Sequence, residues 1–174
     1  KAIKLRYRLI PCLYSLTYVS VLTGEPLARP IFYYGTEGGA LDPAFYETEF
    51  LLGPHLLVAP LMDESSTRAC YLPPGKWHSW WSLREVAGGR VYETVAGLDT
   101  DLPLFIADNA VVPLYPEGVS YVPDGSLETL ELLVTLGTRA QGRVVEYFDR
   151  NSLLAYNVSF TIKEGAVHCE MALM

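Results

Sequence analysis

LLGPHLLVAP (Leu51–Pro60) and YLPPGKWHSWW (Tyr71–Trp81) carry the clearest local patterns in this sequence. In the first stretch, the short apolar run LLVAP closes on Pro60, which is typical of a buried strand. In the second, Pro73-Pro74-Gly75 is a turn that leads into an aromatic strand beginning near Lys76. The two stretches therefore predict two strands of a β-domain.

Further short strands follow at roughly ten-residue spacing, which indicates an antiparallel sandwich. The expected strands are Leu56–Leu61, Ala69–Leu72, Trp77–Trp81, Arg90–Val95, Leu104–Ile106 and Val111–Leu114. Pro116–Ser126 is rich in proline and glycine and is the best candidate linker. Beyond it a second, short β-region is predicted, with strands at Leu127–Leu136, Arg143–Asp149, Leu153–Phe160 and Val167–Leu173.

The first 34 residues have a different pattern. Apolar residues recur at three- and four-residue steps on one helical stripe, namely Ile3, Tyr7, Ile10, Leu13, Tyr14, Thr17 and Val21. Pro11 predicts a kink in this helix and Gly24 its end. Ile31–Tyr33 then predicts a short buried strand, so that helix and strand form the αβ step of a parallel barrel or sheet. This apolar surface predicts a packing partner.

Four stretches in this order closely resemble the C-terminal part of glycoside hydrolase family 31, mainly retaining α-glucosidases and α-xylosidases. They are GEPLARPIFYY (Gly24–Tyr34), the two stretches quoted first, and LPLFIADNAVVPL (Leu102–Leu114), and the resemblance covers about residues 1–115. Ala28 stands where that family commonly has methionine.

The resemblance implies a fold and three domains. The expected fold is mainly β: an antiparallel β-sandwich preceded by a helix and strand from the end of a (β/α)8 barrel. Residues 1–50 would be the C-terminal end of that barrel, 51–116 the proximal β-sandwich domain, and 117–174 the start of a distal β-domain.

Retaining glycosidases need two carboxyl groups, one as nucleophile and one as acid/base. In the family resembled, both are aspartates on barrel strands before the GEPLARP segment, and the tryptophan-aspartate-methionine-asparagine-glutamate word around the nucleophile is missing here. No catalytic residue is therefore assigned. The carboxylates present are expected mostly in turns and caps, namely Asp42, Glu47, Asp63, Asp99, Asp101, Glu146 and Asp149.

Two other groups of residues allow a functional interpretation beside a structural one. Arg29 could reach a substrate, but a structural ion pair at the barrel rim is the favoured interpretation. Trp77, Trp80 and Trp81 could stack on sugar rings, but strand alternation turns one face toward the core, and packing is favoured. Substrate-binding residues are thus left unknown.

Composition narrows the remaining functions. The 13 basic and 20 acidic residues give a net charge of −7, which argues against nucleic-acid and anionic-membrane partners. The histidines (55, 78, 168) and cysteines (12, 70, 169) are widely spaced without a CxxC pair, so neither a metal site nor a disulfide framework is expected. No cofactor is expected. No run of eighteen apolar residues occurs, and the compartment stays open.

Three function classes stay open. The preferred one is the C-terminal portion of a retaining α-glycosidase, inactive alone, whose missing barrel comes from the same polypeptide or a separate chain; self-association is the alternative partner. The second is a carbohydrate-binding β-sandwich module. The third is a structural or interaction remnant.

Overall fold

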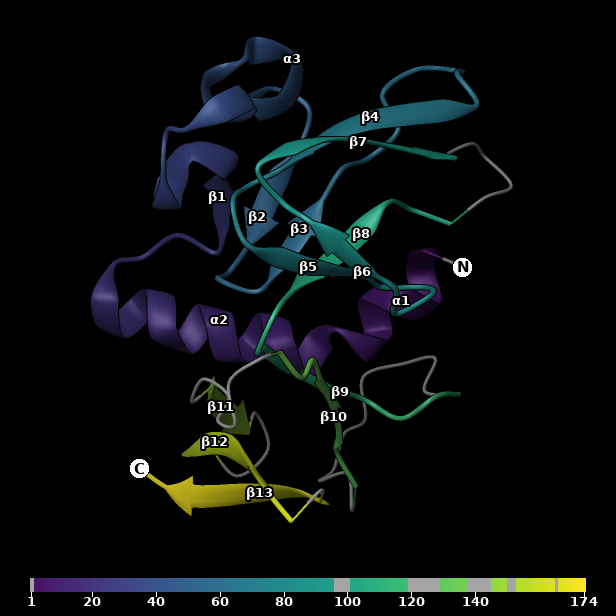
Figure 1. Ribbon diagram of the computed structural model, residues 1–174. Coiled ribbons are helices and arrows are strands. Elements are labelled where there is room, and N and C mark those ends of the chain that lie inside the picture. Colours follow the sequence, from purple (N-terminus) through teal and green to yellow (C-terminus); the bar gives the residue numbers. More distant parts are fainter. Residues whose placement is uncertain (1, 96–100, 119–128, 138–144, 150–152, 165) are drawn as a thin grey trace. The chain divides into compact units, whose positions relative to one another are not determined.

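The computed structural model describes residues 2–95, 101–118, 129–137, 145–149, 153–164 and 166–174 (Figure 1). Contacts divide the chain into two compact units, Ala28–Asp108, here called the central unit, and Lys1–Leu27 with Asn109–Met174, the terminal unit. Every strand pair recorded between described residues is antiparallel, so the mainly β, antiparallel fold is confirmed. These two units are defined by contacts within the structure. The domain limits 1–50, 51–116 and 117–174 were instead inferred from the family resemblance, and they stay a prediction.

The central unit is built on a six-stranded sheet in the order β1-β2-β3-β8-β5-β6. These strands are β1 (Ala28–Pro30), β2 (Phe50–Leu52), β3 (Leu56–Val58), β5 (Lys76–Ser79), β6 (Glu85–Ala87) and β8 (Leu104–Ala107). A separate pair joins β4 (Thr67–Leu72) to β7 (Arg90–Val95). The two stretches first recognised in the sequence thus lie in one sheet, since β3 and β5 both pair with β8, through Leu57–Phe105 and Trp77–Ala107.

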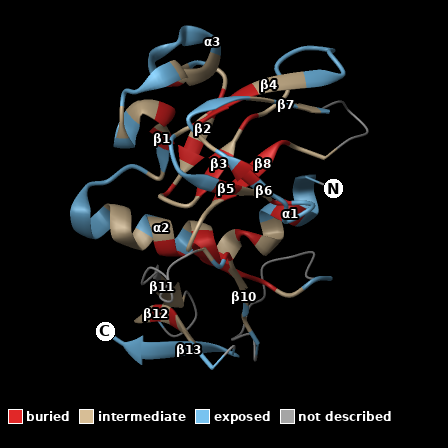
Figure 2. Cartoon of the chain, viewed as in Figure 1, coloured by how far each residue is buried: buried red, intermediate tan, exposed pale blue. Residues whose placement is uncertain are grey.

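The core of the central unit forms where alternating side chains of these strands meet. β3 and β8 carry the most continuous burial in the sheet (Figure 2). The apolar patterns of the expected strands predict nine core residues. Of these Val58 is half-buried and the others are buried, namely Leu57, Tyr71, Leu72, Trp77, Leu104, Ile106, Val111 and Val112. Val111 and Val112 nevertheless belong to the terminal unit, so they serve a different core from the rest.

The glycine-rich loop after Tyr34 packs on a core ring. Gly38 begins a 3-10 helix, η2 (Gly38–Leu41), and a Cβ atom at Gly39 would lie 2.8 Å from Cδ2 of Tyr71. The Tyr71 hydroxyl donates a hydrogen bond of 2.9 Å to the carbonyl of Glu37. The loop needs glycine because the Tyr71 ring occupies the space of a side chain.

Two sequence predictions are wrong in the first half of the central unit. The strand expected at Ile31–Tyr33 is a 3-10 helix, η1 (Ile31–Tyr34), and only Ala28–Pro30 pairs, antiparallel to β2. After Pro30 the backbone takes local bonds instead, such as the one from the Gly35 N–H to the Phe32 carbonyl. Asp42 as N-cap and Pro43 at the first helical position predict a helix over Asp42–Phe50. Only α3 (Pro43–Tyr46) forms, because Phe50 already belongs to β2.

The terminal unit begins with two short helices in place of one kinked helix. α1 (Ala2–Arg8) and α2 (Ile10–Thr23) are separated at Leu9, and Pro11 lies in the first turn of α2. Proline is tolerated there because its missing N–H would have no partner within the helix. The predicted end at Gly24 is confirmed: its φ is 78° and its N–H donates to the Ser20 carbonyl.

The strands of the terminal unit form two small sheets. β9 (Val111–Leu114) pairs with β10 (Glu131–Val134), and β12 (Leu154–Lys163) lies between β11 (Val145–Asp149) and β13 (Ala166–Leu173). Val111, Val158 and Phe160 form a buried cluster, on which half-buried apolar side chains of β10, β11 and β12 pack. Strands at these places confirm the second β-region expected beyond the linker.

The helices bury a different stripe from the predicted one. Leu5, Leu9, Pro11, Cys12 and Ser15 are buried, and α2 contacts β9 and β11. Ile3, Tyr14 and Val21 of the predicted stripe are exposed, and its other members are exposed or half-buried. The chain's own later strands therefore cover one face of the helix, and much of the predicted apolar stripe stays at the surface.

Candidate functional site

The carboxylates named from the sequence hold turns and caps wherever their bonds are recorded. Asp42 Oδ1 accepts the Ala44 N–H at 2.9 Å, which confirms Asp42 as the N-cap of α3. Asp63 accepts bonds from Ser65, and these hold the pKa of Asp63 below its usual value.

The other described carboxylates of that set lie on separate segments, and Asp149 lies in the strand β11 and not in a turn. Glu47 is the exposed C-cap of α3, and Asp101 and Asp149 are half-buried. Asp99 and the side chain of Glu146 lie outside the described residues.

Glu49 is the buried carboxyl that the sequence analysis did not single out. Both of its carboxylate oxygens accept the Tyr71 N–H, at 3.0 and 3.3 Å. Burial raises the pKa of Glu49 to about 8, against the opposing effects of the Tyr71 N–H and the Arg68 charge. Strand alternation could have revealed it, because Glu49 lies two positions before the buried Leu51.

Arg68 lies beside this carboxyl and bonds to the residue before it. Its Nη2 donates to both the carbonyl and the hydroxyl of Thr48. Glu49 and Arg68 thus connect the residues just before β2 to the strand β4. The arrangement is a structural one, since the buried carboxyl group accepts a backbone N–H inside the core.

A histidine–carboxylate pair lies between two neighbouring strands inside the sheet. His78 Nε2 and Asp108 Oδ1 are 3.1 Å apart, with side chains 12% and 15% exposed. Asp108 also donates its N–H to the Lys76 carbonyl, so the pair joins β5 to the end of β8. His55 is half-buried in the turn before β3, and His168 is exposed in β13.

The three tryptophans divide into two buried rings and one exposed ring. Trp77 and Trp80 are buried, and Trp77 Nε1 donates to the Pro73 carbonyl at 2.8 Å. Trp81 is 41% exposed, and its Nε1 donates to the Leu102 carbonyl at 2.7 Å. The expected alternation fails because β5 ends at Ser79, so that Trp80 and Trp81 lie in the turn after the strand.

Arg29 is held by aromatic rings. Its side chain lies in β1, the residue is only 4% exposed, and the guanidinium carbon is 5.0 Å from the ring centre of Tyr33 and 5.5 Å from that of Tyr34. Such cation–π contacts stabilise a buried charge. This geometry supports a structural role for Arg29.

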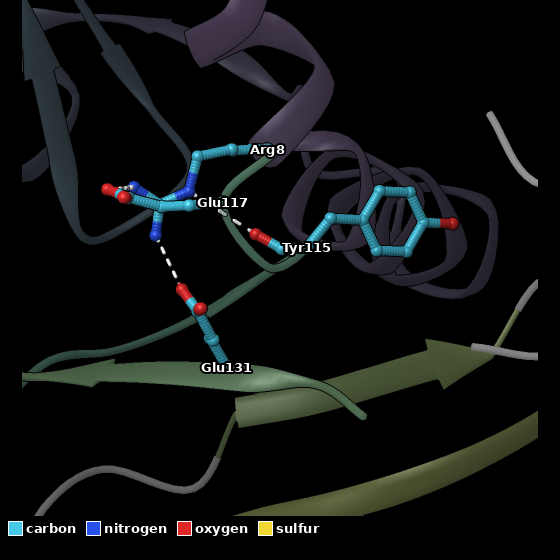
Figure 3. Close-up of polar contacts among 4 residues, drawn as sticks. All are labelled: Arg8, Tyr115, Glu117 and Glu131. Carbon is cyan, nitrogen blue, oxygen red and sulfur yellow. Dashed lines mark hydrogen bonds and ion pairs between the residues drawn. The ribbon is translucent and has the colours of Figure 1, made fainter. Parts of the chain in front are cut away.

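A second arginine ties the helices of the terminal unit to its strands (Figure 3). Arg8 Nη2 lies 2.6 Å from Glu131 Oε2 and Nη1 lies 3.3 Å from Glu117 Oε1. Its Nε donates to the Tyr115 carbonyl, and the Tyr115 N–H donates to the Arg8 carbonyl at 2.9 Å. No sequence signal indicated this cluster, because its partners lie more than 100 residues away.

Within the described ranges, no group of three or more histidine, cysteine, aspartate or glutamate side chains could hold a metal ion. The helices found in those ranges are also too short or too polar to cross a membrane.

Comparison with known proteins identifies the family to which this architecture belongs. Residues 24–112 match the family model described as the glycosyl hydrolase family 31 C-terminal domain. The chain belongs to this family. The matched residues include all the strands of the central unit's sheet, and the buried Trp77 and Leu57 that hold it.

Curated family 31 relatives agree with this assignment. An α-glucosidase of Saccharolobus solfataricus is 30% identical over 112 residues, which are 64% of this chain and 15% of that protein. Alpha-glucosidase 2 of Bacillus thermoamyloliquefaciens is 37% identical over 116 residues, 66% of this chain and 14% of that protein. The chain thus spans about 15% of the length of these relatives and corresponds to their C-terminal domain.

Solved structures of family 31 proteins share the fold. A Flavobacterium johnsoniae dextranase superposes with a TM-score of 0.82 at 20% identity, over 98% of this chain and 22% of that one. An α-xylosidase of Xanthomonas citri gives 0.70 at 23% identity, over 92% and 18%. These likenesses extend to the second β-region and establish the fold of nearly the whole chain.

Proposed function

We propose that this chain is the C-terminal part of a retaining α-glycosidase, which hydrolyses O-glycosidic bonds only together with a catalytic barrel. The match of residues 24–112 to the C-terminal domain of family 31 carries the proposal. The relatives named above are α-glucosidases, and an α-xylosidase of Saccharolobus solfataricus is 30% identical over 123 residues. Because the word around the family nucleophile is missing here, the chain alone is expected to lack the two-carboxylate machinery.

The partner proposed for the chain is that barrel, on the same polypeptide or on a separate chain. Each unit offers an exposed apolar set to it. In the terminal unit Ile3, Val21 and Leu22 are 73%, 79% and 60% exposed. In the central unit the exposed apolar residues include Tyr33, Tyr34 and Leu41. Apolar side chains of this size at the surface favour a protein partner over solvent.

Two measurements test this function. The coding region upstream of Lys1 is expected to encode a barrel with both aspartates. The purified chain alone is expected to show no turnover of aryl α-glucosides or α-xylosides, with an extract of the empty expression host as the control. Turnover that disappears on Glu49→Gln, Asp42→Asn or another change of an acidic residue in this chain would contradict the proposal.

A carbohydrate-binding role is the second candidate, and Trp81 is the observation that favours it. Its ring is exposed while its N–H is bonded to Leu102, so the ring face is held in place at the surface. Flat aromatic faces of this kind bind sugar rings. Titration with maltose, isomaltose and xylose should then change tryptophan fluorescence in the native chain and not in Trp81→Phe. No change in the native chain would remove this candidate.

A further inference from the structure

Glu49 and Arg68 lie close together in the central unit without forming an ion pair. Glu49 is 3% exposed, and its two carboxyl oxygens share a single donor, the Tyr71 N–H. The Arg68 charge acts on this carboxyl, yet the hydrogen bonds of the guanidinium go elsewhere. A buried acidic side chain is ordinarily either neutral or paired with a cation. The proton on Glu49 therefore determines which of the two applies here.

Arg68 has an unbonded donor that such a pair could use. Its Nη2 donates to the carbonyl and to the hydroxyl of Thr48, and both of these acceptors are neutral. Its Nε atom is buried and has no hydrogen-bond partner among the described residues. A buried polar group without a partner is rare and costs free energy. Arg68 is thus held in an arrangement that leaves its guanidinium incompletely bonded near a carboxyl group.

The protonation state of Glu49 determines which acceptor suits Arg68 better. A protonated carboxyl group is neutral and needs no cation inside the core. An ionised carboxylate has about four lone-pair sites, and the single N–H of Tyr71 leaves most of them without a donor. A planar guanidinium fills two of these sites at once and supplies the opposite charge. The neutral Thr48 is a weaker acceptor than this carboxylate.

We propose that Glu49 and Arg68 form a proton-controlled latch, in which Arg68 bonds to Thr48 while Glu49 is protonated and turns to the Glu49 carboxylate when the proton leaves. The structure holds the first arrangement. The second is within reach of the same guanidinium, because Thr48 and Glu49 are consecutive residues and the buried Nε becomes a donor to the carboxylate. The proton that Glu49 releases passes to solvent.

The latch acts on the short helix α3 through Thr48. The Thr48 hydroxyl donates to the Ala44 carbonyl at 2.7 Å, and the Thr48 N–H donates to the Phe45 carbonyl at 2.9 Å. Arg68 therefore ties the end of α3 to β4. When Arg68 turns to Glu49, α3 keeps the contact of the Phe45 ring with the Tyr71 ring but loses this polar attachment. Ionisation of a buried carboxyl group thus loosens a helix at the surface.

The other titratable groups around the latch keep one state while Glu49 titrates. Cys70 on β4 is buried, and burial raises the pKa of its thiol to about 12, so it stays neutral. Hydrogen bonds from a serine two positions on and, to a lesser degree, the Arg68 charge hold the pKa of the exposed Asp63 below its usual value, so it stays ionised. Glu47, at the C-cap of α3, is exposed to solvent and salt, which screen its charge.

Nuclear magnetic resonance on the full chain tests the pairing directly. The carbon signal of the Glu49 carboxyl reports its protonation, and the Arg68 Nε–H signal, assigned by its loss in Arg68→Met, reports the new bond. Between about pH 6 and 9.5 both signals should move with one midpoint, near the Glu49 pKa of about 8. The Nε proton should shift downfield as its bond forms, and in Glu49→Gln it should not move. A Glu49 carboxyl that titrates while the Arg68 signal stays fixed would overturn the proposal, as would a Glu49 that does not titrate in this range.

Hydrogen exchange tests the release of α3. The N–H groups of Thr48 and Glu49 both donate to the Phe45 carbonyl. Their protection factors should fall about tenfold over the same pH range, because the end of α3 loses a bond to a charged group. Glu49→Gln should abolish this fall, and Glu47→Gln, the exposed matched control, should retain it. A fall of the same size in Glu49→Gln would mean that another group loosens the helix and would reject the latch.

Arg68→Met separates the latch from a general loss of stability. Without the guanidinium, α3 should already be loosened at about pH 6. The Thr48 protection factor of this variant should then equal that of the native chain at about pH 9.5 and should not change with pH. Protection at about pH 6 that is the same in Arg68→Met and in the native chain would show that Arg68 does not hold α3, and the proposal would fail.

Discussion

The N–H of Phe148 donates a hydrogen bond of 3.1 Å to the hydroxyl of Ser15, 133 residues earlier in the chain. The Tyr18 ring stacks on the Phe148 ring, with centres 4.8 Å apart and planes 2° from parallel. Ser15 in turn donates to the Pro11 carbonyl at 2.7 Å. The helix α2 is thus attached to β11 by one polar and one aromatic contact on adjacent turns.

Ser15→Ala should destabilise the terminal unit by about 1 kcal/mol or more, because the Phe148 N–H loses its acceptor. Urea unfolding combined with hydrogen exchange of β11 would measure this loss of stability. Thr17→Ala is the matched control, since Thr17 makes the same bond to the residue four before it on an exposed face. Equal small losses in the two variants would show that the bond to Phe148 does not contribute.

Trp77→Ala should cost about 3–5 kcal/mol in the free energy of unfolding, because it empties part of the core and removes the bond to Pro73. Trp81→Ala should cost much less, since that ring is partly exposed. Denaturant unfolding with unchanged m-values compares the two. A Trp77→Ala loss below about 1 kcal/mol would place this ring at the surface and is the result that contradicts the packing.

Gly39→Ala should destabilise the central unit by about 1–3 kcal/mol, because the added methyl group meets the Tyr71 ring. At Gly35 the added Cβ would meet only the end of the Glu37 side chain, which can move away. Gly35→Ala is therefore expected to be nearly neutral. Thermal unfolding of both variants should give a lower melting temperature for Gly39→Ala than for Gly35→Ala. Equal melting temperatures would argue against the close contact with the Tyr71 ring.

The stability of the central unit should fall as pH rises from about 4.5 to about 8. Glu49 has a folded pKa of about 8, against 4.5 for an ordinary glutamate. In that window the unfolded chain has released the proton that the folded chain still holds, so rising pH favours unfolding. Above the folded pKa both the folded and the unfolded chain have released the proton, so the free energy of unfolding no longer changes with pH on account of Glu49.

Glu49→Gln should remove this slope, because an amide oxygen can still accept the Tyr71 N–H without a charge to bury. Urea unfolding at several pH values between 5 and 8 would compare it with the native chain and with Glu47→Gln, an exposed control. Parallel pH dependences for the native chain and Glu49→Gln would show that another group causes the slope.

Local patterns predicted the strands well wherever the chain supplies their neighbours. Arg90–Val95 and Val111–Leu114 match β7 and β9 in full, because each lies between clear turns. Ile31–Tyr33 was mistaken for a strand, since its apolar run was interpreted in the context of a barrel whose neighbouring strands are not in this sequence. The short strands β2 and β6 were missed, being three residues each.

Contacts of high sequence separation were beyond prediction. Glu49 could have been found from its alternation with Leu51, but its acceptor role depends on the Tyr71 N–H, 22 residues away. The Arg8 cluster joins α1 to residues beyond 114, and no local pattern marks it. The buried helical stripe was misjudged for the same reason, because the strands that cover it come from the far end of the sequence.

The terminal unit is made of two segments, 1–27 and 109–174, with the whole central unit between them. Translation therefore delivers the two units in different ways. The central unit leaves the ribosome as one continuous segment and can complete its core at once. The helices emerge earlier but wait for about 80 residues, which take roughly 4–16 s at about 5–20 residues per second, before the second segment with β9 begins to emerge, and longer still for β11. During that interval the apolar face of α2 is available to chaperones.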